Sequence, residues 1–184
     1  MWTLEPRLDM GLTKYSHCSV ALGSWLYTIG GLVDGYYSDR VDAIDTSLLS
    51  TNDSISWARS NWVMKARMNE RRWALGCHAG VFEGQEGIYV AGGRDGSAHF
   101  SASAEFYNLA DDVWHEIGTL YTARAYSPMT IWGGNLIMSG GNNPHYLTSV
   151  ETWNGSSWSK LTNLMVERTS HAAVSIRAGK LSCT

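Results

Sequence analysis

The sequence is poor in charge and in long apolar runs, and each shortage excludes a class of protein. Charged residues make up 17% of the 184 positions, and 14 basic against 17 acidic side chains leave a formal charge of −3. This balance gives no electrostatic signal for a nucleic acid or an anionic membrane as partner. No window approaches the roughly 18 consecutive apolar residues of a membrane-spanning helix, and the first residues lack the apolar core of a signal peptide. We therefore expect a cytoplasmic chain with no nucleic-acid and no membrane partner; a signal peptide on a longer parent chain would make it extracellular.

Cysteine is also scarce, with three residues at Cys18, Cys77 and Cys183. Their number is odd, they lie far apart and none forms a CxxC pair, which argues against a disulfide framework and against a zinc site. Free buried thiols are the simpler interpretation, because unpaired cysteine is among the most often buried residue types. We expect no metal site and no cofactor. Two Asn-x-Ser triplets, at Asn52 and Asn154, would matter only in the secretory pathway.

Glycine and aromatic residues are abundant instead. The chain has 19 Gly, 9 Trp and 9 Tyr, a composition typical of a globular chain with a core and far from that of a disordered one. An apolar run that ends in two adjacent glycines occurs three times, at 26–31, 87–93 and 136–141. Such a run indicates a buried strand that ends where the backbone must turn or approach another segment closely. A repeated strand ending indicates a repeated unit.

Tryptophan recurs in register with the glycine pairs. It stands at positions 2, 62, 114 and 158, so that the intervals are 60, 52 and 44 residues. Ten positions after the last three tryptophans stands an arginine, at Arg72, Arg124 and Arg168, and the first unit has Leu12 there. The variation in length falls in loops, which tolerate insertions. A fixed order of residues at a spacing of 40 to 60 residues is typical of a repeat architecture.

An acidic residue begins a third strand 10 to 12 residues after each glycine pair, at Asp42, Glu105 and Glu151. These short alternating segments predict half-buried strands. Because a buried charge needs a partner, we expect the recurrent arginine and acid to pair with each other in a structural role.

A histidine also recurs, in a strand of small residues that begins each unit. We interpret His17, His78 and His171 as one repeat position. A residue repeated in every unit is typically a satisfied core group, so we do not interpret the three histidines as a metal cluster.

Each unit therefore reads as four short antiparallel strands, and such units at this spacing predict the blades of a β-propeller. Here the chain resembles the kelch-repeat family, whose signature is an apolar strand ending in Gly-Gly, then a spaced aromatic residue and a tryptophan. Ile44 replaces the first aromatic residue in the first unit, which makes that unit the weakest match. The residues that match the motif structurally are Gly30, Gly31, Trp62, Gly92, Gly93, Tyr107, Trp114, Gly140, Gly141, Trp153 and Trp158.

The expected fold class is all-β, an incomplete kelch-type β-propeller of about three and a half four-stranded blades. We expect strands near 17–22, 25–30, 40–45 and 60–63, near 77–82, 87–92, 103–108 and 113–117, and near 126–132, 135–140, 148–153 and 157–161. The predicted division of the single propeller fragment is an orphan outer strand at 1–8, blades at 12–63, 72–118 and 124–162, and the start of a further blade at 168–184. Closed propellers have at least four blades, so the remainder is expected from a longer parent chain.

The order of antiparallel strands predicts where a partner would bind. The loops between second and third strands share one rim with the connections between blades. On that rim gather Tyr, Arg, His and Asn, residue types that make adaptable contacts with peptides or loops. The predicted partner-binding residues are Asp34, Tyr36, Tyr37, Asp39, Arg94, Asp95, His99, Phe100, Asn142, Asn143, His145 and Tyr146.

The resemblance implies a protein-interaction module, because kelch propellers commonly bind a peptide or loop of another protein on one rim. They do so as the substrate-recognition part of cullin-type ubiquitin ligase adaptors, or they bind actin. An alternative is a fragment of a propeller enzyme of the copper radical oxidase or sugar epimerase class. We find no Tyr, Cys and His set at a recognisable spacing, so we expect no catalytic residues and no enzyme. A third possibility is an extracellular adhesion or glycan-binding propeller.

Overall fold

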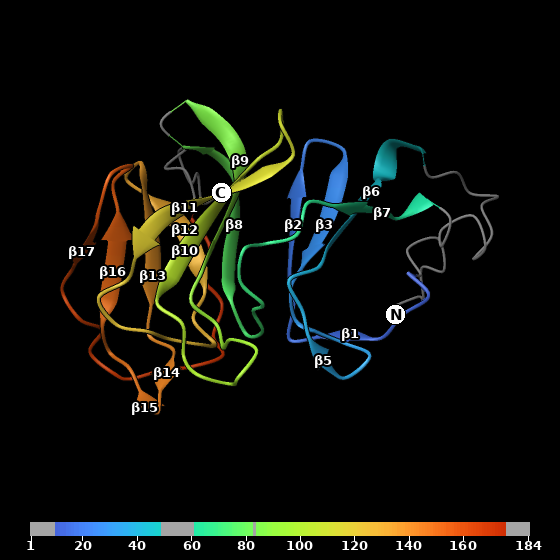
Figure 1. The fold of residues 1–184 in the computed structure, drawn as a ribbon. Coiled ribbons are helices and arrows are strands. Elements are labelled where there is room, and N and C mark those ends of the chain that lie inside the picture. The colour runs from blue at the N-terminus through green and yellow to red at the C-terminus, as the bar shows by residue number, and fades with distance from the viewer. Residues whose placement is uncertain (1–9, 49–60, 83, 176–184) are drawn as a thin grey trace, which may run out of the picture.

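The computed structural model describes residues 10–48, 61–82 and 84–175, whose regular secondary structure is almost entirely β-strand. Three four-stranded antiparallel sheets follow one another in an arc, each with its strands in chain order (Figure 1). The first contains β2 (Cys18–Leu22), β3 (Trp25–Ile29), β6 (Val41–Asp45) and β7 (Val63–Lys65). The second contains β8 (Gly76–Phe82), β9 (Gln85–Ala91), β10 (Ser103–Asn108) and β11 (Val113–Thr119). The third contains β12 (Met129–Trp132), β13 (Asn135–Ser139), β16 (Val150–Trp153) and β17 (Trp158–Lys160).

These sheets are the blades of an incomplete kelch-type propeller, and the predicted fold class is confirmed. Two strands begin three residues later than expected. The fourth strand of the first blade starts at Val63 instead of 60, and the first strand of the third blade starts at Met129 instead of 126. The second shift has a clear cause, since Pro128 has no N–H to give to a strand ladder. The predicted orphan strand at 1–8 lies outside the described residues, and the predicted domain boundaries stay a prediction.

The described part of the chain contains little helix. A short 3₁₀ turn, η2 (Thr46–Leu48), follows the third strand of the first blade. Among the residues that the structure describes, no helix is long and apolar enough to cross a membrane.

Two apolar cores lie between consecutive blades, and β9 contributes to both. Ile88 and Val90 pack with the first blade in one core, whereas Tyr89 and Ala91 pack with the third blade in the other. Successive side chains of a strand point to opposite faces, so a strand in the middle blade is covered on both sides. This explains why residues 88–91 read as a continuous apolar run and not as an alternating one.

An aromatic pair from each of the last two blades fills the wedge against the preceding blade. Tyr107 and Trp114 lie directly opposite each other on β10 and β11, with ring centroids 5.1 Å apart, and Trp153 and Trp158 do the same on β16 and β17. All four are buried, with at most 7% of their surface exposed. The Trp114 indole also donates a hydrogen bond to the carbonyl of Ala66, at the end of the first blade (2.9 Å).

The glycine pairs mark the places where two blades touch through their backbones. Gly92 and Gly93 both have positive φ, at 64° and 94°, which glycine adopts without steric cost. A Cβ on Gly92 would collide with the carbonyl of Arg124, and the N–H of Gly93 donates to that carbonyl (2.8 Å). The same bond joins Gly31 to Arg72 at 2.7 Å and Gly141 to Arg168 at 2.8 Å. The glycine pair is therefore a docking point for the backbone of the next blade.

The side chain of the interblade arginine is fully buried and pairs with the repeated acid, as the sequence predicts. Arg72 lies 2.8 Å from Glu105, and Arg124 lies 2.5 Å from Glu151. Arg124 also donates to the carbonyls of Gly140 (2.8 Å) and Ser149 (2.9 Å). The carboxylate of Glu151 in turn accepts the backbone N–H groups of residues 121 and 122, so the charges at this site are paired and hydrogen-bonded.

In the first blade a different residue pairs with the repeated acid. The assignment of Leu12 to the arginine position is wrong, because the arginine stands two residues before the positive-φ residues Ala74 and Tyr126, and Lys14 stands two residues before the equivalent Ser16. Lys14 takes that place and donates to the carbonyl of Thr28 (2.9 Å) and to Asp42 (3.3 Å). Burial lowers the pKa of Lys14 to about 8, against the opposing attraction of Asp42.

Cys18 and Cys77 form a disulfide, so the expectation of free thiols is wrong for this pair. The bond joins the innermost strands of the first two blades, β2 and β8, whose Cα atoms at these residues lie 6.1 Å apart. The two cysteines occupy different places in their repeats and are 59 residues apart, so their spacing along the chain gave no sign of pairing. Cys183 lies outside the described residues.

Reduction of this disulfide should destabilise the chain. Closing a loop of 59 residues is worth about 4 kcal/mol in the chain-entropy account of disulfides. We expect the free energy of unfolding, measured in urea with and without a thiol reductant, to fall by that amount. The variant Cys18→Ala/Cys77→Ala should be insensitive to the reductant. Equal stability of the wild type in both conditions would show that the bond does not form.

Truncation of Trp114 should destabilise the fold far more than truncation of an exposed tryptophan. We expect Trp114→Ala to cost about 3–5 kcal/mol, because it leaves a cavity between two blades. Trp132, at 68% exposure, is the matched control, and Trp132→Ala should cost under about 0.5 kcal/mol. Urea unfolding of both variants measures the difference, and similar losses in the two would contradict the placement of Trp114.

Removal of the Arg124 charge should be costly because it leaves Glu151 buried without its partner. We expect Arg124→Met to lose about 3–5 kcal/mol of stability, and the double variant with Glu151→Leu to recover part of that loss. Arg67→Met is the control, since Arg67 is 52% exposed and its ion pair with Asp39 should contribute at most about 1 kcal/mol. A larger loss in the Arg67 variant would refute the structural role of the buried pair.

Candidate partner-binding rim

One edge of the propeller carries a small hairpin from each blade. The loops between second and third strands form β4 (Leu32–Val33) with β5 (Tyr36–Tyr37), and β14 (Asn142–Asn143) with β15 (His145–Tyr146). These elements lie along the lower edge in Figure 1, together with the connections between blades. We call this edge the hairpin rim, and the edge formed by the short turns at the other end of the strands the turn rim.

Each hairpin pairs with the connection that enters its own blade. In the first blade, β4 lies between β5 and β1 (Lys14–Tyr15). In the second, Arg94 bridges Trp73 on one side and Phe100 on the other. The third blade repeats the arrangement, with Asn142 between Ala125 and Tyr146. An aromatic residue therefore stands at one equivalent position of all three hairpins, as Tyr37, Phe100 and Tyr146.

Five side chains from the three blades form one continuous group on this rim, which we call the aromatic cluster. The rings of Tyr37 and Trp73 stack with centroids 6.1 Å apart, and Tyr126 meets Trp73 edge-on at 5.8 Å. The Arg94 guanidinium lies 4.5 Å from the centre of the Phe100 ring and 5.5 Å from that of Trp73. All five are half-buried, so the cluster is held in place and still reaches the surface.

The three predicted acids of the rim serve mainly to build the hairpins. Asp34 accepts hydrogen bonds from the backbone and the hydroxyl of Thr13, which lower the pKa of its carboxyl group. Asp39 pairs with Arg67 at 2.6 Å. Asp95 accepts the backbone N–H groups of Ser97 and His99 inside its own turn. These acids therefore fix the shape of the rim more than they offer charge to a partner.

The remaining predicted residues flank the aromatic cluster. Tyr36 and Tyr146 are exposed, at 79% and 57%, and His99 and His145 are exposed as well. Asn143 donates to the carbonyl of Ala123 (2.7 Å). Asn142, His145 and Tyr146 line a surface hollow of about 500 Å³ together with Pro144 and Glu167.

The inner end of the hairpin rim is closed by a chain of backbone hydrogen bonds around the propeller axis. The N–H of Ala74 donates to the carbonyl of Ser16, that of Tyr126 to Ala74, and that of Ser170 to Tyr126, at 2.8 to 2.9 Å. The four residues share a positive φ between 52° and 56°. They line an axial hollow of about 270 Å³.

The same register corrects the assignment of the histidines. His17 and His171 follow the positive-φ residue and line the axial hollow, whereas Leu75 has that place in the second blade. His78 lies three residues further on, paired with Tyr89 on β9, so the interpretation of three histidines at one repeat position is wrong. Burial lowers the pKa of His17 and of His171, which favours their neutral forms.

Sequence reasoning missed Trp73 and Tyr126, two of the five members of the aromatic cluster. Both lie in the connections between blades, directly after Arg72 and two residues after Arg124. The connections were expected on this rim, but the predicted contact residues come only from the loops between second and third strands. Their position one or two residues after the interblade arginine is the signal that would have found them.

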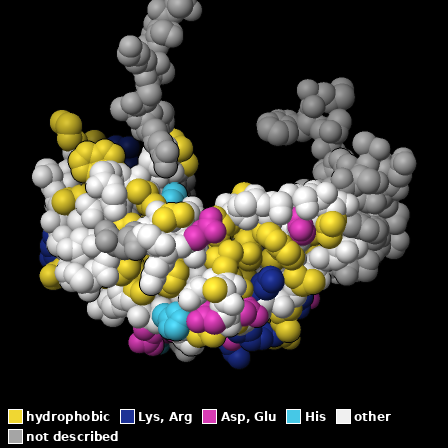
Figure 2. Space-filling view, turned by 90° about the horizontal axis from the view of Figure 1, so that it is seen from above, with side chains coloured by type: hydrophobic (Ala, Val, Ile, Leu, Met, Phe, Trp, Pro, Cys, Tyr) yellow, Lys and Arg dark blue, Asp and Glu magenta, His cyan; other side chains and the backbone are white. Residues whose placement is uncertain are grey.

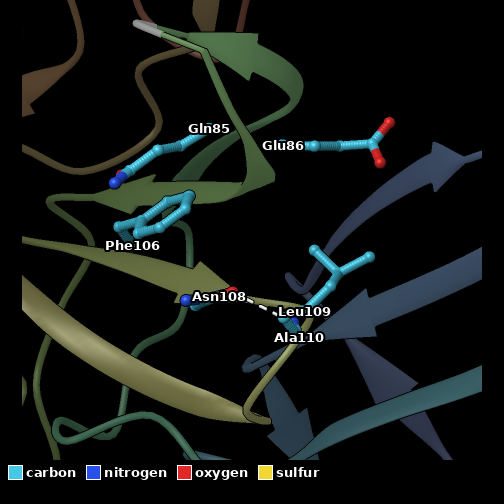
Figure 3. Close-up of a pocket in the computed structure, with 6 residues that line it drawn as sticks. All are labelled: Gln85, Glu86, Phe106, Asn108, Leu109 and Ala110. Atoms are coloured by element: carbon cyan, nitrogen blue, oxygen red, sulfur yellow. Dashed lines mark hydrogen bonds between the residues drawn. The ribbon is translucent and has the colours of Figure 1, made fainter.

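The turn rim offers a different surface. Figure 2 shows this face, where apolar side chains gather in the middle with acidic ones beside them. A hollow of about 390 Å³ opens in the second blade between the start of β9 and the turn at 108–112 (Figure 3). It is lined by Gln85, Glu86, Phe106, Asn108, Leu109 and Ala110. In the part of the chain that the structure describes, no three His, Cys, Asp or Glu residues gather closely enough to hold a metal ion.

Comparison with known proteins agrees with this architecture. Residues 75–120 match the Kelch motif family, over the whole of the second blade. The chain carries a kelch repeat. The resemblance inferred from glycine pairs and tryptophans is thereby confirmed, and kelch repeats are in general protein-interaction modules.

A solved structure shares the kelch-type fold. The structure titled "Structure of YjhT" superposes on 85% of this chain with a TM-score of 0.65 and 14% sequence identity. This chain spans 54% of the length of that structure. At this identity the similarity concerns the fold alone.

Proposed function

We propose that this chain is a protein-recognition module that binds a peptide or loop of another protein on the hairpin rim. The observation that carries the proposal is the aromatic cluster, because it combines the features of an interface anchor. Aromatic residues and arginine dominate interface energetics, most of all where they are partly desolvated and held in one conformation.

The cluster is preorganised, which reduces the entropy lost on binding. Trp73 and Arg94 exchange backbone hydrogen bonds with each other at 3.1 and 2.8 Å, so the rings and the guanidinium stand on a fixed framework. Tyr and Trp side chains lose little conformational entropy for the area they bury. The exposed Tyr36 and Tyr146 extend the same surface on either side.

The resemblance to kelch propellers implies two specific forms of this role. One is substrate recognition within a cullin-type ubiquitin ligase adaptor, and the other is binding of actin. Co-sedimentation with filamentous actin distinguishes the two roles. An actin-binding chain would pellet with the filaments, whereas an adaptor would stay in the supernatant.

Loss of the rim side chains should abolish binding without unfolding the chain. Peptides would first be selected on the wild-type chain from a displayed random library, and their dissociation constants measured by fluorescence anisotropy. The triple variant Tyr36→Ala/Arg94→Ala/Tyr146→Ala should bind them at least about 30-fold more weakly, since one anchor contributes about 2 kcal/mol or more.

The matched control carries three exposed apolar residues of the turn rim, in the variant Val81→Ala/Val113→Ala/Trp132→Ala. It should bind as the wild type does, and both triple variants should melt close to the wild-type temperature. Loss of binding in the control and not in the rim variant would place the site on the turn rim and refute the proposal.

A further inference from the structure

The disulfide and one surface turn together indicate a covalent modification. The bond between Cys18 and Cys77 joins two blades near the propeller axis, and Cys77 is only 8% exposed. Disulfides form and persist in oxidising compartments and are rare in the cytosol. No metal-binding group of His, Cys, Asp and Glu occurs among the described residues, so metal binding gives no other reason for these thiols to lie together.

Asn154 begins an Asn-Gly-Ser triplet in the turn between β16 and β17. Such a triplet is the acceptor sequence for N-linked glycans, provided that its middle residue is not proline. Asn154, Gly155 and Ser156 are all exposed. The acceptor sequence therefore lies at the surface of the folded blade.

The hydrogen bonds of the turn use only the oxygen of the Asn154 side chain. Oδ1 accepts the N–H of Ser156 (3.1 Å), its hydroxyl (3.0 Å) and the N–H of Ser157 (3.0 Å). Nδ2, the atom that a glycan joins, makes no hydrogen bond with the described residues. A glycan on Nδ2 would therefore leave the turn intact.

We propose that the chain matures in the secretory pathway and that Asn154 carries an N-linked glycan there. The proposal replaces the cytoplasmic location expected from the sequence, and it is independent of the proposed function. The other triplet, at Asn52, lies outside the described residues and is not part of it.

The position of Asn154 suits a glycoprotein that binds its partner on the opposite edge. The turn belongs to the turn rim, so a glycan there leaves the hairpin rim free. Ser156 and Ser157 line a hollow of about 340 Å³ with Ile117, Leu120 and Tyr121. A glycan on Asn154 stands beside this partly apolar surface and would shield it from other chains.

Peptide mapping of the full chain tests the acceptor. The chain is directed into the endoplasmic reticulum of cultured cells, purified, and treated with a glycosidase that converts a glycosylated Asn to Asp. The glycosidase step is run in water enriched in oxygen-18, because Asn154-Gly155 can also deamidate to Asp without a glycan. We expect oxygen-18-labelled Asp at position 154, and we expect Asn154→Gln and Ser156→Ala each to abolish that glycan. Asn163→Gln is the control, because Asn163 is exposed but lies outside any acceptor triplet. An unmodified Asn154 overturns the proposal.

The compartment is tested on the native protein, taken from its own cells with thiols alkylated before lysis. We expect a peptide that links Cys18 to Cys77 and a glycan at Asn154. Alkylated Cys18 and Cys77, or an unmodified Asn154 in a disulfide-linked chain, overturns the proposal. This peptide map is made on the wild-type protein. A failure of the Asn154→Gln variant to be secreted therefore does not change its result.

Discussion

The buried arginine between blades is the residue on which the rest of the structure depends. Arg124 accepts the N–H of Gly93 through its carbonyl, while its side chain binds the third blade through Glu151 and the carbonyls of Gly140 and Ser149. One residue thus ties the backbone of one blade to the acid of the next. A guanidinium can do this because it has five donors in a planar fork, and its burial is tolerated because those donors are satisfied. Because the glycine pair has no Cβ atoms, the arginine carbonyl can approach its backbone.

The fixed position of the interblade arginine also determines the shape of the hairpin rim. Once the arginine is fixed, the one or two residues after it are fixed as well, and in this chain they are Trp73 and Tyr126. The hairpins of the second and third blades pair with the same connections, which brings Arg94 and Phe100 to Trp73. The aromatic cluster is therefore a consequence of how blades join. A change in the rim side chains leaves the arginine contacts in place, so recognition and folding can vary independently.

Much of the fold could be predicted because the residues that stabilise it recur from blade to blade. The errors concern residues and bonds that do not recur. Glycine pairs, tryptophans and the paired arginine and acid each appear two or three times in register, so their positions support one another. His78 was misplaced because small residues in the first strands align at more than one offset. Lys14 was missed because it stands two positions beyond the place that the tryptophan spacing predicts. The Cys18–Cys77 bond occurs once and joins unlike repeat positions. The rim could be located from strand order, but the meeting of Tyr37, Trp73 and Tyr126 depends on how side chains pack across blades.

The disulfide lies at the blade whose repeat motif is least complete. In the first blade Ile44 takes the place of an aromatic wedge residue, and a lysine takes the place of the arginine. An ammonium group has fewer donors than a guanidinium and is more strongly hydrated, so its burial is harder to offset, and the pKa of Lys14 falls accordingly. A covalent bond from Cys18 to the better-packed second blade restrains this unit whatever the strength of those contacts. The blades with a complete motif are thus held together by recurrent noncovalent contacts. The first blade, whose motif is incomplete, is also held by the disulfide.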